Sequence, residues 1–348
     1  MRLGVHIAYW GLGLSSADQL AIVREAERIG YDSAWIGEAY GSDAATVLAW
    51  TAAQTSTIRL GSAVFQLPGR SAAMTAMTAA TLDQLSGGRL ILGLGASGPQ
   101  VSEGWHGIRY SGQLTRTRDY VAAVRMALSG QRLDYRGESL QVPLPDGPGK
   151  ALKLTISPFQ QRIPVFLAAL GPKNTQLAAE IGDGVLPLLF SPEHVDLMRK
   201  ELQTGVDRAG NGKTLDDIEI TPTVNVFVSD DIDAARDAQR PILALYIGGM
   251  GPRNKNFYNR LVRQYGFEEA ADQVQALYLE GKTKEAAAAL PDELIDLICL
   301  VGPQARVKER LAAYRDAGVG TLTVSPIART SEERIEQLRL LAELSTAL

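Results

Sequence analysis

The 348-residue sequence is poor in cysteine and histidine, on which disulfide frameworks and most transition-metal sites depend. It has one cysteine, Cys299, and three histidines in distant segments. One thiol cannot form an internal disulfide, and three separated histidines do not form a cluster of metal ligands. Cys299 lies in the apolar run 294–301, where a thiol is usually a small buried hydrophobe. We therefore expect no metal site and no catalytic cysteine.

Long apolar runs and an excess of positive charge are also lacking. No apolar run reaches the roughly 18 residues that a membrane span requires, and the opening MRLGVHIAYWG lacks the charged stretch and apolar core of a secretory signal. The 35 basic residues are scattered and are outnumbered by 39 acidic ones, for a net charge of −4. No basic stripe that could follow nucleic acid phosphates is visible. We expect a cytoplasmic protein that binds neither membrane nor nucleic acid.

The sequence does contain eight short aliphatic runs separated by longer amphipathic stretches. This alternation is typical of parallel strands joined by crossover helices, and runs that are apolar throughout indicate strands covered on both faces. The expected strands are residues 3–8, 33–37, 58–65, 89–94, 163–169, 184–189, 218–228 and 320–325. We predict an α/β protein with a TIM-like (β/α)8 barrel that forms a single domain over residues 1–348. An open doubly wound sheet remains the alternative, because strand order cannot be read from one sequence.

Two segments are longer than an ordinary connection between a strand and a helix, and we interpret them as inserts. Residues 132–158 are rich in proline and glycine, whereas residues 248–290 have a helical pattern after a glycine-rich lead-in that we expect to be exposed. Inserts in barrels usually serve the active site or the contact between subunits.

Function in such a barrel is expected at the carboxyl ends of the strands, because the loops there converge on one concave site. His6 on the first strand is either a neutral histidine hydrogen-bonded inside the barrel mouth or a contact to cofactor or substrate. Glu38 directly follows the second strand, so its carboxylate is expected at the rim of the site. The alternative is that Glu38 pairs with an arginine such as Arg70 to hold loops together.

The ends of the third, fourth and fifth strands are rich in glycine and other small residues. The sequences GSAVFQLPGR and LGLGASGP either leave room for a flat ring or form ordinary tight turns. The second of them superficially resembles a dinucleotide-binding loop, but its glycine spacing is wrong and we reject that interpretation. At AALGPKN a Gly-Pro turn leads into a helix whose unpaired backbone N–H groups suit a phosphate, although proline is common in the first turn of any helix.

Four motifs in a fixed order carry a resemblance to a known family. They are GEAYGSD (37–43), GSAVFQLPGR (61–70), GRLILGLGASGPQVSEGWHG (88–107) and PVFLAALGPKNTQLAAEIGDGVLPLL (164–189). Together they resemble the luciferase-like monooxygenase superfamily, and in particular its branch that uses the deazaflavin coenzyme F420. The resemblance covers residues 3 to about 228 and 320–327.

The resemblance implies a bacterial-luciferase-like barrel with a flavin or deazaflavin across its mouth. In relatives a non-proline cis peptide distorts the third strand behind the ring, and Ala63-Val64 occupies the matching place. Glu38 matches an acidic residue near the ring, and residues 168–172 match the segment that contacts the cofactor tail and its phosphate. The cofactor-binding residues implied in this way are Glu38, Ala63, Val64, Gln66, Gly95, Ser97, Gly98, Ala169, Leu170, Gly171 and Pro172.

One position departs from the family pattern. Sugar-phosphate dehydrogenases and light-emitting members carry a histidine directly after the acidic residue, whereas this sequence has Ala39. The departure disfavours a sugar-phosphate oxidation that uses this histidine as base. The remaining candidates for a catalytic proton donor or acceptor are Glu38, His6, His106 and Tyr40. His106 follows the fourth strand and either reaches the substrate or packs its own loop.

The function implied is an F420-dependent oxidoreductase that transfers a hydride between the deazaflavin and a small organic substrate. One alternative is an FMN-dependent monooxygenase that uses O2 and receives reduced flavin from a partner reductase. An alternative of another class is a barrel that binds a flavin or deazaflavin without turnover. By resemblance, we also expect a homodimer packed through the first helices.

Overall fold

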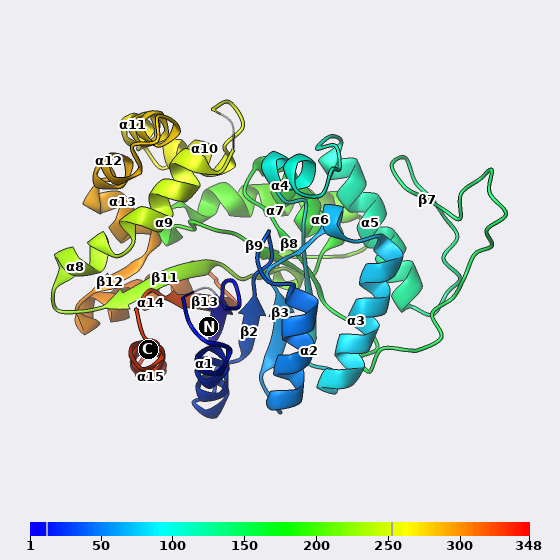
Figure 1. Ribbon diagram of the computed structural model, residues 1–348, viewed down its shortest axis with the longest axis horizontal. Helices are drawn as coiled ribbons and strands as arrows, with labels where there is room; N and C mark the ends of the chain where they lie inside the picture. Colours follow the sequence, from blue (N-terminus) through cyan, green and yellow to red (C-terminus); the bar gives the residue numbers. More distant parts are fainter. Residues whose placement is uncertain (12, 252) are drawn as a thin grey trace.

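The computed structural model describes residues 1–11, 13–251 and 253–348. Its centre is a curled parallel sheet with helices around it (Figure 1). Neighbouring strands follow the order β10, β9, β8, β5, β3, β2, β1, β13, β11 and β12, and β4 pairs with β5. Their bounds are β1 (Arg2–Ile7), β2 (Ser33–Ile36), β3 (Arg59–Ser62), β4 (Phe65–Gln66), β5 (Leu90–Gly95), β8 (Val165–Ala168), β9 (Gly184–Leu186), β10 (Glu219–Ile220), β11 (Thr223–Val228), β12 (Leu300–Gly302) and β13 (Thr321–Pro326).

The sheet closes on itself because β10 and β11 are two parts of one extended segment. This segment is interrupted at Thr221 and Pro222, and proline has no N–H to donate to a neighbouring strand. On one side the Thr221 N–H donates to the Val185 carbonyl of β9 at 2.9 Å. On the other side the Thr323 N–H of β13 donates to the Pro222 carbonyl at 3.0 Å. The predicted TIM-like barrel is therefore confirmed, and the open-sheet alternative is wrong.

Fifteen α-helices in the described residues surround and extend the barrel. They are α1 (Ser16–Arg28), α2 (Ala44–Gln54), α3 (Ala72–Ser86), α4 (Pro99–Gly104), α5 (Gln113–Leu128), α6 (Pro172–Ile181), α7 (Val195–Ala209), α8 (Ile232–Asp237), α9 (Arg240–Ala244), α10 (Phe257–Gln264), α11 (Glu268–Leu279), α12 (Thr283–Ala288), α13 (Asp292–Ile298), α14 (Gln304–Asp316) and α15 (Ser331–Thr346). Several begin at a side-chain cap: the Ser15 hydroxyl accepts from the Asp18 N–H at the start of α1, for example.

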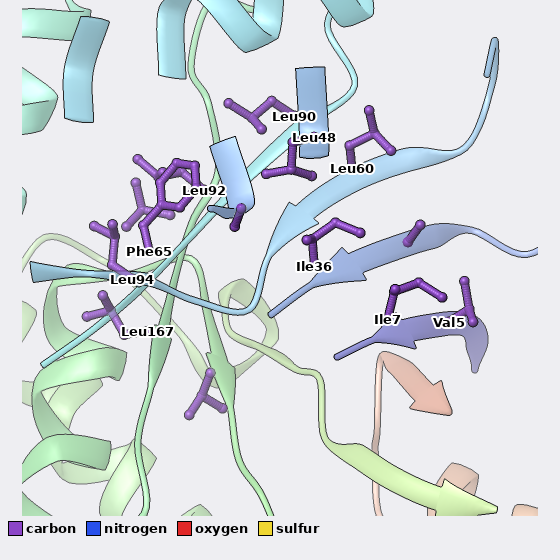
Figure 2. Close-up of a cluster of buried hydrophobic side chains, with 14 of the residues drawn as sticks. Val5, Ile7, Ile36, Leu48, Leu60, Phe65, Leu90, Leu92, Leu94 and Leu167 are labelled. Carbon is purple, nitrogen blue, oxygen red and sulfur yellow. The ribbon is translucent and has the colours of Figure 1, made fainter. Parts of the chain in front are cut away.

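The main hydrophobic core lies between the outer face of the barrel and the helices. Alternate residues of each strand point outward into this layer, and Figure 2 shows a group of them meeting helix side chains such as Leu48. Each such side chain that is fully removed from water contributes about 1.5–3 kcal/mol. The labelled strand residues of this group are Val5, Ile7, Ile36, Leu60, Phe65, Leu90, Leu92, Leu94 and Leu167.

The inside of the barrel is filled by a second, smaller cluster of bulky side chains. Trp35, Ile91 and Phe166 come from three different strands and are almost fully buried. Glycine faces the large rings: a Cβ on Gly61 would lie 2.2 Å from the Trp35 ring, and one on Gly184 would lie 2.7 Å from Phe166. The cluster closes the barrel interior, so any ligand must bind above it at the open end.

The helical insert is larger than the sequence pattern predicted. We expected helices over 248–290, whereas α8 begins at Ile232 and α13 ends at Ile298. The expected exposed lead-in is instead a π-helical turn, Leu245–Gly249, in which Gly248 is buried. A Cβ on Gly248 would lie 2.5 Å from Tyr278, so the missing side chain is what allows the close packing. Pro252 lies outside the described residues.

The insert 132–158 and the segment that contains Cys299, β12 and α14 differ in how well the sequence predicts them. Residues 132–158 contain the hairpin β6 (Tyr135–Arg136) and β7 (Gln141–Val142), which protrudes on the right of Figure 1, away from the helical insert. β12 and α14 were not predicted. Cys299, between α13 and β12, is buried, and burial raises the pKa of its thiol, which keeps it protonated.

None of the described helices combines the length and apolar character needed to cross a bilayer. Within residues 1–11, 13–251 and 253–348, no group of three or more histidine, cysteine or acidic side chains is placed to hold a metal ion.

Candidate active site at the barrel mouth

The open end of the barrel has a floor with almost no side chains. Register and alternation place five small residues in the inward-facing positions at the strand ends. They are Ala8, Gly37, Ala63, Gly95 and Ala168. Ala8 and Ala168 are exposed, although both adjoin buried strands. A flat ring can therefore approach the backbone at this end of the barrel.

The third strand is distorted at the place that the resemblance indicated. The peptide bond between Ala63 and Val64 is cis, and it separates β3 from β4. The Val64 side chain then covers Gly95 of the next strand, where a Cβ would lie 2.5 Å from Val64 Cγ2 and 3.4 Å from Ala168 Cβ. The predicted cis peptide is confirmed, and it lies beside the small-residue floor.

Glu38 forms an ion pair with Arg70. The Arg70 guanidinium donates to both carboxylate oxygens, with Nη2 to Oε2 at 2.9 Å, and it also pairs with Asp43. The Ala44 N–H donates to Glu38 Oε2 at 3.0 Å. The Glu38 side chain is 8% exposed and that of Arg70 13%, so the pair is largely out of water. The structure therefore shows the pairing of Glu38 with Arg70 that the sequence analysis gave as an alternative.

This pairing changes the role that we assign to Glu38. Both of its oxygens already accept hydrogen bonds from a guanidinium, which makes the carboxylate a weak candidate for a general base. The contacts instead tie the loop after β2 to the segment after β4, with the Arg70 guanidinium 4.5 Å from the centroid of the Phe65 ring. Glu38 is thus better described as a positioning residue behind the floor.

Gln66 of β4 and Ser97, which follows β5, extend the same hydrogen-bond network to the end of β5. The Gln66 side chain is buried, donates to the Ala39 carbonyl at 2.7 Å and accepts from the Ser97 hydroxyl at 2.9 Å. Ser97 has a φ of +63°, an uncommon conformation for a residue other than glycine. Hydrogen bonds of the Gln66 side chain therefore join the segments after β2 and β5 to β4.

His6 faces the barrel interior beside Trp35, its register partner on β2. Burial lowers the pKa of His6 from 6.5 to about 4, because the imidazolium loses its hydration there. His6 is therefore neutral at physiological pH, as expected for a histidine inside the barrel mouth. A neutral imidazole can still donate or accept a hydrogen bond at the mouth.

We expect the low pKa of His6 to make the protein less stable in mild acid. The unfolded chain binds a proton near pH 6.5 and the folded chain near pH 4, so stability is complete above pH 6.5 and is lost as pH falls through this window. Between pH 7.5 and pH 5 the loss from this group is about 2 kcal/mol. Urea unfolding at both pH values measures it, and His6→Gln should show a correspondingly smaller difference. Equal differences for the two proteins would contradict the assignment.

His106 lies against the loop that follows β4. A Cβ on Gly69 would be 3.2 Å from His106 Cε1, and the buried His106 Nε2 has no hydrogen-bond partner in the described residues. His106 therefore lies beside Gly69 and Arg70 at the mouth, and its Nε2 is free to bond a ligand. Tyr40, the remaining catalytic candidate, is 60% exposed after β2.

The start of α6 forms the other side of the candidate site. Gly171 is the N-cap, no side chain caps the helix, and Pro172 follows at the first position. The next backbone N–H groups are unpaired within the helix and carry its positive dipole end, which suits a phosphate. Ala169, Leu170 and Pro172 also line a cavity of about 100 Å³. The assignment of this segment to a cofactor tail stays a prediction.

Four tyrosines that sequence analysis did not single out gather near the mouth. Tyr9 follows β1, Tyr110 follows α4, and Tyr246 and Tyr258 come from the insert. The rings of Tyr246 and Tyr258 meet edge to face with centroids 4.8 Å apart. Burial raises the pKa of Tyr246 to about 12, and the neighbouring phenols Tyr9 and Tyr40 add to the shift. These phenols are protonated at neutral pH and can donate hydrogen bonds. Their convergence from distant segments left no local signal in the sequence.

Known proteins resemble this chain over nearly its whole length. It is 41% identical to a Mycobacterium tuberculosis protein named as a coenzyme F420-dependent oxidoreductase, over 98% of this chain and 99% of that protein. It is 30% identical to the 5,10-methylenetetrahydromethanopterin reductase of Archaeoglobus fulgidus, over 90% and 91%.

Among solved structures, the fold is similar to that of the coenzyme F420-dependent tetrahydromethanopterin reductase from Methanopyrus kandleri. The TM-score is 0.83 at 21% sequence identity, covering 99% of this chain and 98% of that one. A family model described as luciferase-like monooxygenase matches residues 6–321. The resemblance predicted from the four motifs is confirmed, and the chain belongs to the luciferase-like monooxygenase family.

Proposed function

We propose that this protein is an F420-dependent oxidoreductase that transfers a hydride between the deazaflavin and a small organic substrate at the barrel mouth. The observation that carries the proposal is the floor of small residues beside the cis peptide Ala63-Val64, in a chain whose 41% identical relative is named for F420. The floor ends at α6, whose uncapped start suits the phosphate of a cofactor tail.

The residues present fit such a cofactor. Ala63 and Val64 would lie under the ring, with the Val64 side chain packed over Gly95, where a Cβ would lie 2.5 Å from Val64 Cγ2. Gln66, Ser97 and Gly98 would border the ring, and Ala169, Leu170, Gly171 and Pro172 would hold the tail. When bound, F420 supplies the carbon that accepts or donates the hydride.

The protein's own groups would orient the substrate and move the accompanying proton. The Glu38–Arg70 pair holds the strand ends in place, and neutral His6 offers a hydrogen bond from inside the barrel. Tyr246 and Tyr258 of the insert lie near Tyr9, which follows β1, and their protonated phenols suit them to hold a substrate oxygen or nitrogen. His106 and Tyr40 remain candidates for the proton donor or acceptor.

Titration of the purified protein with each cofactor tests the proposal. We expect saturable binding of F420, followed by a change in deazaflavin absorbance when a panel of small alcohols, carbonyl compounds and imines is added to the oxidised or reduced cofactor. Binding of FMN but not of F420, with O2 uptake when chemically reduced FMN and a substrate are supplied, would favour the monooxygenase that needs a flavin reductase. Tight F420 binding without turnover on any panel member would favour the non-catalytic barrel.

We also propose that the protein is a cytoplasmic homodimer, packed through α2 and α3. Met74, Met77 and Leu85 on α3 are 51%, 50% and 59% exposed, and Trp50 on α2 is 38% exposed. Such a group of exposed apolar side chains on neighbouring helices is typical of a subunit interface.

The double substitution Met74→Glu and Met77→Glu should convert the dimer to a monomer, because it places charges in the interface. Sedimentation velocity at micromolar concentration measures the change. Leu144→Glu in the protruding 132–158 segment, where Leu144 is 73% exposed, is the matched control and should remain dimeric. A monomeric unsubstituted protein would contradict the proposal.

A further inference from the structure

We infer that the helical insert carries a second binding site, for a small ligand with two or more phosphate or carboxylate groups. The site is a cavity of about 560 Å³ between α10, α11 and the residues before α10. Its volume lies in the usual range for small-molecule sites. Leu261 and Tyr265 face the smaller cavity beside α6, whereas Arg260 and Arg263 line the larger one. The two cavities therefore use different faces of the same helix.

The charge of the lining selects an anion. Arg253, Arg260 and Arg263 contribute three positive charges and Asp272 one negative charge, which leaves a net +2. The whole protein has a net charge of −4, so this concentration of positive charge is local. Converging guanidinium groups in a concave site attract phosphates and carboxylates and bind them through paired N–H groups.

The arginines are held in place to different degrees. Arg263 Nε donates to Asn259 Oδ1 at 2.9 Å, and its guanidinium pairs with Asp272. The Arg260 guanidinium lies 4.6 Å from the centroid of the Phe257 ring. Stacking on an aromatic ring leaves the edge of a guanidinium free to donate to a ligand. Arg263 thus forms part of the wall, and Arg260 is the group that we assign to ligand contact.

Gln275 provides an independent indication of a ligand. Its side chain lines the cavity, is 5% exposed, and has an Nε2 without a hydrogen-bond partner in the described residues. Buried donors are almost always paired, because leaving one unpaired costs about 1–3 kcal/mol. A ligand oxygen would satisfy this donor. Gln275 thus adds a neutral donor to a wall that is already rich in positively charged ones.

The floor of the cavity is a fixed network of amides. The π-helical turn Leu245–Gly249 leaves backbone carbonyls available, and Asn256 Nδ2 donates to those of Tyr246 and Ile247 at 2.9 and 3.0 Å. Asn259 Nδ2 donates to the Ile247 carbonyl at 3.2 Å and to the Ala271 carbonyl at 2.7 Å. Because these side chains are already bonded, the arginines and Gln275 are presented on a rigid support.

Calorimetric titration of the cofactor-free protein with inorganic pyrophosphate, and separately with citrate, tests this site. We expect one ion to bind per chain, and Arg260→Gln and Gln275→Leu each to weaken the affinity about tenfold. Arg208→Gln, which removes an exposed arginine on α7, is the control and should change the affinity less than about twofold. Melting curves show whether each variant is folded.

Two results of this first titration would overturn the inference. One is the absence of saturable binding of either anion up to about 10 mM. The other is an equal loss of affinity in Arg208→Gln and Arg260→Gln, which would indicate nonspecific attraction. The titration is then repeated with F420 bound: unchanged anion affinity is expected, and competition would show that the cavity belongs to the anionic tail of the cofactor. Because the first titration needs no cofactor, it does not depend on the proposed function.

Discussion

Replacing Arg70 by methionine should destabilise the protein by about 3–5 kcal/mol, because it leaves the Glu38 carboxylate buried without its partner. The Ala44 N–H would be its main remaining donor. Urea unfolding monitored by circular dichroism measures the loss. Arg118→Met is the matched control: Arg118 pairs with Glu180 in a similar bidentate way but is 45% exposed, so its loss should be about 1 kcal/mol or less.

The double variant Glu38→Gln with Arg70→Met separates the charge from the packing. Without the buried carboxylate most of the lost stability should return, since a neutral amide tolerates burial better than an unpaired anion. If the double variant is no more stable than Arg70→Met alone, or if Arg70→Met loses less than about 1 kcal/mol, the structural role assigned to this pair is wrong.

Enlarging Ala168 to leucine should abolish useful binding of F420. Ala168 is exposed at the end of β8 and lies beside Val64 and Gly95, so a leucine there would project over the floor of the mouth. We expect the dissociation constant to rise at least about a hundredfold, which corresponds to about 2.7 kcal/mol. Fluorescence titration of the deazaflavin measures it.

The matched control is Ala305→Leu, an exposed position on α14 that is not among the residues assigned to the mouth. Both variants should unfold within about 0.5 kcal/mol of the parent protein, because neither enlarged side chain enters the core. Binding by Ala168→Leu within a factor of about three of the parent protein would place the cofactor elsewhere.

The barrel could be predicted from the sequence because its signal is local and repeated. Each strand is a short apolar run and most helices follow at regular spacing, so eight units were visible without any long-range information. β12 has no separate signal, because Leu300 and Val301 merge with the apolar end of α13 in the run 294–301. The sequence does carry a helical pattern for α14, since Val307, Leu311 and Tyr314 recur at helical spacing and are buried.

The sequence predicted those features of the site that lie within a single segment, and not those formed by residues far apart in the chain. The start of α6 lies within one motif and follows from its Gly-Pro turn, whereas the cis peptide was implied only by the family resemblance. Whether Glu38 pairs with Arg70 was left open, because the pair joins residues 32 positions apart. The tyrosines of the mouth converge from β1, the loop after α4 and the insert, and no local pattern links them.

A crystal structure with F420 bound tests the central claim most directly. We predict the deazaflavin ring in contact with Ala63, Val64 and Ala168, and the tail phosphate at the backbone N–H groups that begin α6. A ring bound away from this floor, or a tail that does not reach Gly171, would contradict the account.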